Sequence, residues 1–433
     1  MKTDFSFFYK RRFFPLFGSQ LLSVFNDNLV RVSIFVLITY HGLGVLGIEP
    51  ALLNNVAAGL FMLPYFLFSA TASHVCERFD EAKVAKAVKI SEICIVTLSG
   101  VGFYLHSAVL LLIALFLMGI HSTFFGIVKY SILPKYLSQQ ELVGGNGLVE
   151  MGTFIAILSG QIVGTQMVKG GAEMMIALTL TTAIVGYAFA YFMPKLEPVN
   201  PQQKVSFNIA KDTKSIIVAV WRHKDLRAAI LGLSWFWLLG SVYTTQLISF
   251  TKLNLGGSED VFTLLLALFS IGIAIGSVTC AKLSKGNLEL GLVLVGAFGM
   301  TIAGSALAFP FIKPYEGAEI GIGLFLQTPQ YWISMISILC LGFFGGFFTV
   351  PLYTWLQYAS ANSSLSQAVA VNNIVNAIYM VFAAGASTLL LLWLDNVAIL
   401  FVLIAIGNVF AMAHLVKVAP VIWETKFSWL KRH

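Results

Sequence analysis

The chain has 433 residues, of which 58% are hydrophobic and 11% are charged, and its formal net charge is +7. This composition excludes a soluble globular domain and indicates a protein that crosses a membrane many times. Basic residues held at the inner membrane surface explain the positive charge, so we expect no nucleic-acid partner.

Twelve apolar segments are each long enough to cross a hydrocarbon layer roughly 30 Å thick, which takes about 20 helical residues. The sequence therefore predicts an all-α membrane protein with twelve transmembrane helices. The predicted segments are 13–40, 51–76, 86–106, 107–130, 146–168, 172–194, 227–251, 260–282, 288–309, 331–356, 366–393 and 396–417. The first segment is too long, and too polar at its centre, to be a cleavable signal peptide.

The first segment carries polar residues that share one helix face. They are Gln20, Ser23, Asp27 and Arg31, with Asn26 and Asn28 beside them. A charge at mid-membrane costs roughly 2.5–3.5 kcal/mol, so both charged residues must face protein or water. Two compatible interpretations stay open. Asp27 and Arg31 neutralise each other at i, i+4, or they present opposite charges to a zwitterionic or anionic head group.

Two charged loops occupy matching places in the chain. The first runs from Ser73 to Lys83 after the second segment, and the other runs from Gly276 to Glu289 after the eighth. Charge pairs in such loops hold conformations and do not touch substrate. We therefore predict gating roles for the charged residues Glu77, Arg78, Lys83, Lys285 and Glu289.

The fourth and fifth segments add two further charges. Glu150 lies on one face of the fifth segment with Asn146, Thr153 and Gly160, and Gln161 lies beside that face. Lys129 lies at the inner end of the fourth segment. We favour a gate formed by a Glu150–Lys129 ion pair over direct contact of Glu150 with a ligand, and both remain possible functions of this pair.

The stretch 119–155 recurs without gaps at 342–378, which predicts two related halves. Tyr130 in the first copy corresponds to Tyr353 in the second. Lys129 corresponds to Leu352, and Glu150 to Asn373, so only the first half carries these charges. A symmetric scaffold with an asymmetric site is typical of a membrane transporter.

We divide the chain into a six-helix bundle at 1–194, a basic linker at 195–226 and a second six-helix bundle with a short tail at 227–433. Within the linker, apolar residues spaced among lysines over 205–221 predict a helix on the inner membrane surface. Lys169, Lys252 and Lys313 fall in the odd-numbered loops, and Arg31 lies inside a segment. The other basic residues are assigned to the side of both termini, which we therefore predict to be cytoplasmic.

The second half supplies neutral polar residues. Trp235, Trp237, Tyr243 and Gln246 on the seventh segment pack or line an aqueous vestibule, with Tyr243 and Gln246 taken as candidate substrate contacts. Asn372, Asn373 and Asn376 on the eleventh segment are further candidate contacts. Such a cluster is also often a hydrogen-bonded contact between helices.

Several motifs resemble those of the bacterial lysophospholipid transporters of the major facilitator superfamily. The similar stretches are Phe25 to Leu29, Gly126 to Pro134, Asn146 to Glu150 and Gly276 to Glu289. Six helices, a basic linker and six more helices are likewise similar to that superfamily, in which two bundles rock about a central cavity. The loop from Ser73 resembles the superfamily signature Gly-x-x-x-Asp-Arg-x-Gly-Arg, with Ser, Glu and Ala replacing Gly, Asp and Gly.

The resemblance implies a flippase that moves lysophosphatidylethanolamine and similar lipids from the outer to the inner leaflet of the bacterial inner membrane for reacylation. It also implies head-group or gate roles for Asp27, Asn28, Lys129 and Glu150. Arg31 departs from some members, which are apolar there. The likeness is closest to the form fused to a lysophospholipid acyltransferase and acyl-ligase. No such domain follows here, and a separate or fused acyltransferase/acyl-ligase is a possible partner. We expect the protein itself to be a monomer.

Two alternative functions are a proton-coupled transporter and an enzyme. A proton-coupled transporter of another small amphiphile or drug would use Asp27 or Glu150 as its titrating group. An enzyme is not expected, because His74 is one residue too far from Asp80 for the His-x4-Asp of an acyltransferase, and no other catalytic motif occurs. The four cysteines lack metal-ligand spacing, so we expect them to be reduced and expect neither metal nor cofactor. They are Cys76, Cys94, Cys280 and Cys340.

Overall fold

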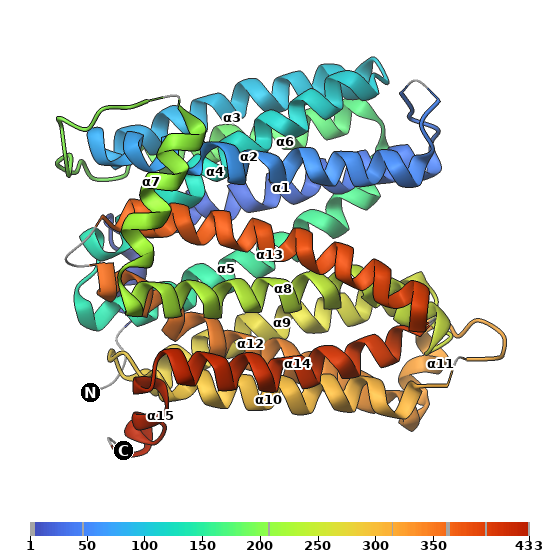
Figure 1. Ribbon diagram of the computed structural model, residues 1–433. Coiled ribbons are helices and arrows are strands. Elements are labelled where there is room, and N and C mark those ends of the chain that lie inside the picture. Colours follow the sequence, from blue (N-terminus) through green and yellow to red (C-terminus); the bar gives the residue numbers. More distant parts are fainter. Residues whose placement is uncertain are drawn as a thin grey trace.

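Long α-helices make up almost all of the fold (Figure 1). The computed structural model describes residues 5–431 apart from 46, 207, 314, 361–363 and 395. Inside a membrane every backbone N–H and C=O must be bonded within its own segment, which long apolar helices achieve. The all-α membrane fold expected from the sequence is confirmed.

The long helices form two bundles. The N bundle contains α1 Phe14–Tyr40, α2 Pro50–Arg78, α3 Glu81–Tyr104, α4 Ala108–Tyr136, α5 Gln139–Met167 and α6 Ala172–Tyr191. The C bundle contains α8 Lys224–Leu253, α9 Glu259–Ser284, α10 Gly291–Ala308, α12 Trp332–Ala359, α13 Leu365–Leu394 and α14 Val397–Val418. Shorter helices are α7 Ile209–Trp221, α11 Ile322–Gln327, α15 Val421–Glu424 and α16 Ser428–Lys431.

Within the described residues, 11 helices are long and apolar enough to cross a membrane. The twelfth long helix is α3, which matches the predicted segment 86–106 but carries several charged residues in its first half. One of them corrects the sequence assignment. Lys89, counted among the basic residues outside the membrane, is fully buried inside the N bundle.

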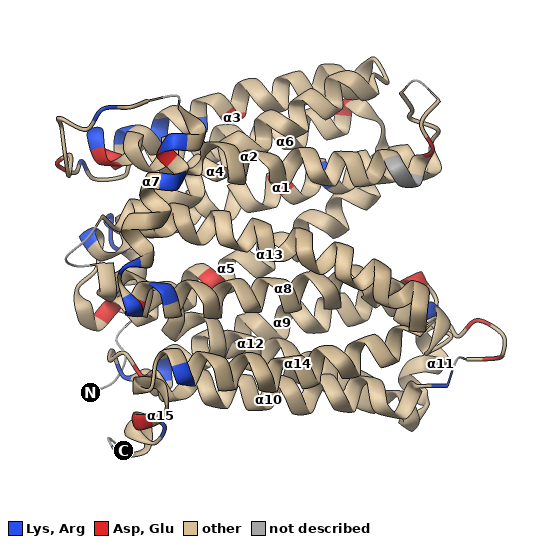
Figure 2. Ribbon diagram, in the orientation of Figure 1, with Lys and Arg blue, Asp and Glu red and all other residues tan. Residues whose placement is uncertain are grey.

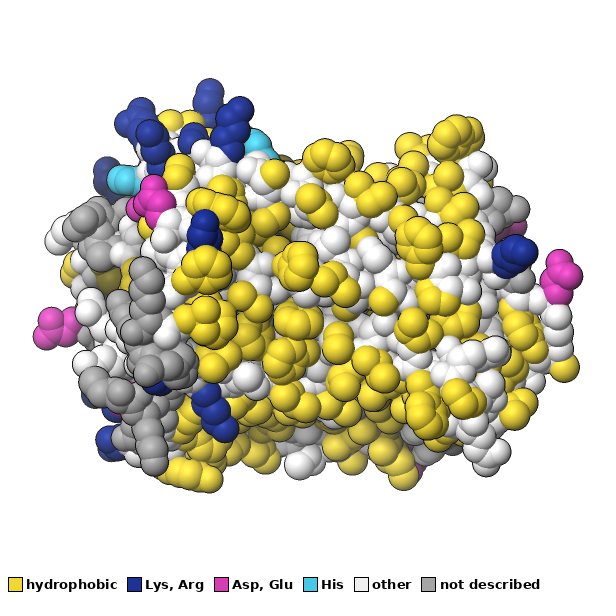
Figure 3. All heavy atoms as spheres, turned by 90° about the horizontal axis from the view of Figure 1, so that it is seen from below, with side chains coloured by type: hydrophobic (Ala, Val, Ile, Leu, Met, Phe, Trp, Pro, Cys, Tyr) yellow, Lys and Arg dark blue, Asp and Glu magenta, His cyan; other side chains and the backbone are white. Residues whose placement is uncertain are grey.

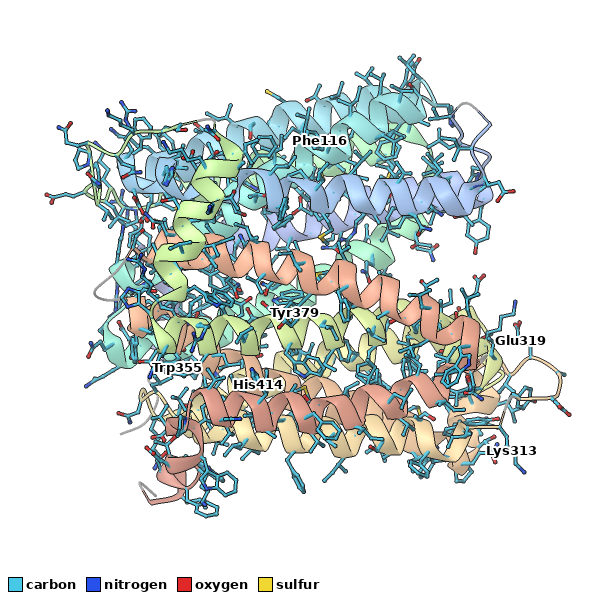
Figure 4. The ribbon with its side chains drawn as sticks, in the orientation of Figure 1. Phe116, Lys313, Glu319, Trp355, Tyr379 and His414 are labelled. Atoms are coloured by element: carbon cyan, nitrogen blue, oxygen red, sulfur yellow. The ribbon has the colours of Figure 1, made fainter. Side chains whose placement is uncertain are left out.

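Charge divides the molecule into two ends and an apolar middle. Most Lys and Arg residues gather at the end that holds both termini and α7, here called the basic end (Figure 2). Lys313 and Glu319 lie at the opposite end (Figure 4). Seen from below, apolar side chains cover much of the surface between the two ends (Figure 3). Large apolar side chains such as Phe298 and Phe410 are largely exposed. This is the pattern of a protein surrounded by lipid.

The linker helix α7 lies at the basic end and packs against α2, α8 and α13, so it touches both bundles (Figure 1). It begins at the Asn208 cap, whose side chain accepts from the Lys211 backbone N–H. Ile216 and Val220 are buried, and lysines lie on its other faces. The amphipathic segment predicted over 205–221 thus forms a helix, although Phe207 lies outside the described residues.

Glycines bring particular helix pairs into backbone contact. A Cβ on Gly160 of α5 would come within 2.5 Å of the Phe25 carbonyl oxygen of α1. A Cβ on Gly276 of α9 would come within 2.0 Å of the Phe343 carbonyl oxygen of α12. Small residues of this kind allow membrane helices to pack closely without a hydrophobic driving force. The pairs α1–α5 and α9–α12 are therefore close backbone contacts inside the two bundles.

The two bundles meet at the basic end. All side-chain hydrogen bonds between them, among the described residues, involve residues in the basic-end halves of their helices. Asn146 of α5, for example, donates to Gln357 Oε1 of α12 at 2.6 Å. Towards the opposite end, α1 and α13 diverge (Figure 1). The conformation is thus closed at the basic end.

Candidate functional site

Two tyrosines that correspond in the internal repeat stack on each other between the bundles. The rings of Tyr130 on α4 and Tyr353 on α12 are 4.4 Å apart and nearly parallel, with an interplanar angle of 4°. Because each is the repeat equivalent of the other, the approximate twofold axis passes between them. Gln357 Nε2 donates to the Tyr130 carbonyl oxygen at 3.2 Å and ties the same two helices together. We call Tyr130 and Tyr353 the tyrosine pair.

Glu150 contacts this pair directly. Tyr130 Oη donates to Glu150 Oε1 at 2.6 Å, and the carboxylate is almost completely buried at 1% exposure. Its second oxygen, Oε2, has no hydrogen-bond partner in the protein. On the other side of the pair, Trp237 of α8 donates through its indole N–H to Tyr353 Oη at 3.2 Å and stacks on Phe154 of α5. A buried carboxylate with a free oxygen can accept a further hydrogen bond from a ligand.

Lys129 lies beside Glu150 without pairing with it. Its ammonium is 3.5 Å from Thr153 Oγ1 and lies 4.8 Å from the centroid of the Tyr130 ring. No ion pair joins Lys129 to Glu150 in the described structure, so the gate predicted from such a pair is not formed in this conformation. Thr153 in turn contacts Gln20 Oε1 of α1 at 3.2 Å. The Lys129 ammonium and the Glu150 carboxylate therefore lie near each other, and each can still bond to a further group.

Asp27 and Arg31 form a second charged layer on α1. Asp27 accepts a hydrogen bond from Ser122 Oγ of α4, and its Oδ1 has no partner. Arg31 donates to Asn28 Oδ1 at 2.6 Å and lies over the Phe61 ring of α2 at 5.2 Å. No ion pair links Asp27 to Arg31 within the described residues of this conformation. The two side chains therefore have separate partners within a largely apolar bundle.

The three asparagines of α13 divide between two environments. Asn372 is buried, and its Oδ1 has no partner. Asn373 faces α4 of the other bundle, where its Nδ2, also without a partner, lies 3.8 Å from where a Cβ on Gly126 would stand. Asn376 instead accepts from Ser234 Oγ of α8 at 2.7 Å. Asn376 is thus a contact within the C bundle, whereas the other two have free polar atoms.

Three predicted substrate contacts lie away from these groups. The predicted position of Tyr243 is corrected by the structure. Its ring packs on Phe401 of α14 and its hydroxyl lies against Gly304 of α10, inside the C bundle. Gln246, one turn further along α8, is half-buried. Gln161 on α5 is also half-buried. Among the described residues, no hydrogen bond joins either glutamine side chain to the site.

The first predicted gating loop makes a contact between the bundles. Glu77, at the end of α2, accepts hydrogen bonds from Ser364 Oγ and from Gln367 Nε2 at 2.9 Å, at the start of α13. Arg78 lies over the neighbouring Phe79 ring at 5.3 Å and makes no ion pair within the described residues. Lys83 is exposed. Of the three charged residues, only Glu77 joins the bundles here.

The second gating loop packs against the N bundle through its backbone. Helix α9 ends at Ser284, its C-cap residue Lys285 has a φ of 48°, and Gly286 follows with a φ of 79°. This left-handed turn places Gly286 so close to Gln140 of α5 that a Cβ would lie 2.7 Å from its carbonyl oxygen. Glu289 accepts from Ser428 Oγ of the C-terminal segment. The loop therefore contacts both its own bundle and the other one.

A buried charged cluster was missed from the sequence. Lys89 and Glu92 of α3 form an ion pair at 0% and 1% side-chain exposure, and His121 Nε2 of α4 is 3.3 Å from Glu92 Oε2. Asn26 Nδ2 donates to Glu92 Oε1 at 3.1 Å, and Ser23 Oγ lies 3.4 Å from both charged groups. The i, i+3 spacing of two charges inside segment 86–106 was the available signal.

Taken together, the tyrosine pair and the polar groups described around it and on α1 offer both signs of charge, free hydrogen-bonding atoms and aromatic surfaces. Charged groups lie on α1, α4 and α5 of the N bundle, whereas the C bundle contributes neutral and aromatic side chains. No group of three or more His, Cys, Asp or Glu residues that could hold a metal ion occurs in the described part of the chain. The arrangement suits recognition of a polar group carrying both charges, with an apolar part attached.

Comparison with known proteins agrees with this architecture. The profile of the Major Facilitator Superfamily matches residues 16–384. The chain is similar to a protein of Escherichia fergusonii named lysophospholipid transporter LplT, at 26% identity over 96% of this chain and 95% of the relative. It is similar to the protein of the same name from Photorhabdus laumondii at 26% identity over 86% of this chain and 87% of that one.

Solved structures show the same fold at low sequence identity. The human organic anion transporter MFSD10 (TETRAN) superposes with a TM-score of 0.72 at 14% identity, covering 94% of this chain and 99% of that one. The fucose:proton symporter FucP of Escherichia coli superposes with a TM-score of 0.68 at 10% identity, covering 94% and 98%. At these identities the likeness concerns the fold alone.

Proposed function

The chain belongs to the Major Facilitator Superfamily, and from that premise we propose that it moves lysophospholipids across the inner membrane of a bacterium. Curated relatives named lysophospholipid transporter, which match over nearly their full length, support this substrate class. The direction that we propose is from the outer to the inner leaflet, where the lipid is then available for reacylation.

The observation that carries the proposal is the set of buried charged groups on α1, α4 and α5 of the N bundle. Asp27 and Glu150 each keep one carboxylate oxygen without a protein partner, and both are buried. Lys129 and Arg31 supply positive charge in the same bundle without pairing with either carboxylate. A glycerophosphate head group with an amine carries both signs, so it can bond to the lysine or arginine through phosphate and to a carboxylate through nitrogen.

Alternating access supplies the route. Hydrogen bonds and the tyrosine pair close the basic end, whereas the helices diverge towards the opposite end. We place the basic end in the cytoplasm, because Lys and Arg are retained on that side of bacterial membranes. In this orientation the observed conformation receives substrate from the outer leaflet. Entry of a head group at Glu150 would compete for the carboxylate that now accepts from Tyr130, and so would favour release of the tyrosine pair.

The test is lipid flipping in liposomes that contain the purified chain. Fluorescent lysophosphatidylethanolamine is added outside, and its protection from a membrane-impermeant quencher measures transfer to the inner leaflet. A charge-assisted hydrogen bond is worth about 1.5–3 kcal/mol. Asp27→Asn and Glu150→Gln should therefore each slow flipping about 10- to 150-fold.

Tyr243→Phe is the matched control, because Tyr243 lies inside the C bundle away from the charged groups. This variant should flip lipid at the wild-type rate. Equal rates for wild type, Asp27→Asn and Glu150→Gln, with all three folded by size-exclusion chromatography, would contradict the assignment of the site.

A second candidate is proton-coupled transport of another small amphiphile. One observation favours it: His121 Nε2 lies 3.3 Å from Glu92 Oε2, and both residues are buried in the N bundle, where ionisable residues often mark ion pathways. The same liposomes separate the two functions. Flipping that persists without a pH gradient supports the first, whereas transport that collapses with the gradient and with Asp27→Asn supports the second.

A further inference from the structure

A groove of about 660 Å³ lies on the flank of the N bundle. Its walls come from α2, α3 and α4, and no residue of the C bundle lines it, so it is separate from the site between the bundles. The lining is almost entirely apolar and includes Val75, Val88, Ile95 and Leu117. A site of this volume is in the range that holds a small ligand or one hydrocarbon chain.

The groove runs from the basic end towards the middle of the membrane. Lys83, Ala87, Ser91 and Ile95 of α3 line it at successive helical turns. From Lys83 to Ile95 the helix rises about 18 Å, which is more than half of a hydrocarbon layer roughly 30 Å thick. The groove is therefore oriented as a lipid acyl chain of the adjacent leaflet would be.

A single cation stands at the surface end of the groove. Lys83 is exposed, and its side chain makes no hydrogen bond or ion pair within the described residues. Lys135, by contrast, is paired with Glu81 at 2.7 Å, and Lys86 lies over the Tyr191 ring at 5.1 Å. Lys83 is the only Lys or Arg among the residues that line the groove, and its ammonium is available to an external anion at the depth of lipid phosphates.

We propose that this groove binds an anionic phospholipid of the leaflet at the basic end, with one acyl chain along α3 and the phosphate on Lys83. Charge complementarity selects the head group, and the apolar walls select a lipid over a free phosphate ion. The site does not rest on the transport proposal. Phe79, which forms part of its wall, follows directly after the loop residues that include Glu77, so the lipid lies beside the contact between the bundles.

The experiment is native mass spectrometry of the full chain released from detergent after titration with phosphatidylglycerol or phosphatidylcholine. Wild type should retain one phosphatidylglycerol about 10-fold better than phosphatidylcholine. Lys83→Ala should reduce that preference at least 5-fold, whereas the matched Lys86→Ala should leave it within 2-fold. Ala87→Trp, which fills the groove, should abolish retention of the tightly bound lipid. Ile90→Trp, on the same helix but outside the groove, should not.

Each outcome decides the proposal. An equal preference in Lys83→Ala and Lys86→Ala, or full lipid retention in Ala87→Trp, would overturn it. Thermal unfolding of the four variants in detergent identifies any that are misfolded, and Lys83→Ala, at an exposed position, keeps the test valid if Ala87→Trp is lost. No lysophospholipid is present, so failure here leaves the transport proposal untouched, and failure of flipping leaves this site untouched.

Discussion

Breaking the buried Lys89–Glu92 ion pair should destabilise the protein more than any surface change. Both side chains are almost completely inaccessible, at 0% and 1% exposure. Removal of one partner of a buried pair leaves an uncompensated charge and costs about 3–5 kcal/mol. This corresponds to a loss of two to nearly four orders of magnitude in the ratio of folded to unfolded protein.

The contacts that remain after each single substitution predict which variant loses more stability. Lys89→Met leaves Glu92 with Asn26 Nδ2 at 3.1 Å and His121 Nε2 at 3.3 Å. Glu92→Gln leaves the Lys89 ammonium with Ser23 Oγ at 3.4 Å as its hydrogen-bonding neighbour besides the new amide. We therefore expect Glu92→Gln to cost at least as much as Lys89→Met.

The double variant Lys89→Met/Glu92→Gln removes both charges and keeps an acceptor for Asn26. Replacement of both partners of a buried pair by neutral groups is often neutral. The double variant should therefore lie within about 1 kcal/mol of wild type, which with single costs of about 3–5 kcal/mol each gives a coupling energy of at least about 5 kcal/mol in the mutant cycle. Unfolding by sodium dodecyl sulfate in mixed micelles, followed by tryptophan fluorescence, measures all four proteins.

Lys83→Met is the control, because exposed substitutions usually change stability by less than about 0.5 kcal/mol. Single variants at positions 89 and 92 that also cost less than 1 kcal/mol would refute the reasoning. A double variant as unstable as the sum of the singles would refute it as well, because the two charges would then not depend on each other.

Three further outcomes follow from packing and from the gate. Gly276→Ala should cost about 1–3 kcal/mol or more in the same unfolding assay, because its Cβ would lie 2.0 Å from the Phe343 carbonyl oxygen. Asn408→Ala should cost about 1–3 kcal/mol, because it leaves the Trp235 indole N–H, now bonded at 2.8 Å, without an acceptor. Tyr353→Leu removes an aromatic stack worth about 0.5–1.5 kcal/mol, so the ratio of open to closed basic ends should rise about 2- to 13-fold. Electron–electron resonance with one spin label on each bundle at the basic end measures that ratio, and an unchanged distance distribution would exclude a gating role for the stack.

The spans were predictable because length and hydropathy act locally along the chain. Helix α1 begins at Phe14 and ends at Tyr40, against a predicted 13–40. The internal repeat likewise identified Tyr130 and Tyr353 as equivalents, although only the structure shows that they touch. Contacts between bundles join residues far apart in sequence, and no local pattern contains them.

Helix rotation limited the prediction of the site. The period of α8 places Tyr243 on a known helical face, but not whether that face turns towards the other bundle or towards α14. The structure turns it inward against Phe401. Tyrosine is found both in packed cores and at the edge of wet cavities, so the residue type does not show which way this helix face turns. Lys89 was missed for a different reason. The rule that assigns basic residues to one side of the membrane was applied to a residue that lies inside a predicted span.

The glycine contacts determine which parts of the molecule can change shape. Where α9 meets α12 and α1 meets α5, main chain lies on main chain, and no intervening layer of side chains can rearrange to let one helix slip past the other. The polar bonds that close the basic end, by contrast, exchange readily for water. Each bundle therefore behaves as a stiff block, and the free-energy difference between inward and outward states depends on the contacts that join the two blocks, which include these polar bonds and the tyrosine pair.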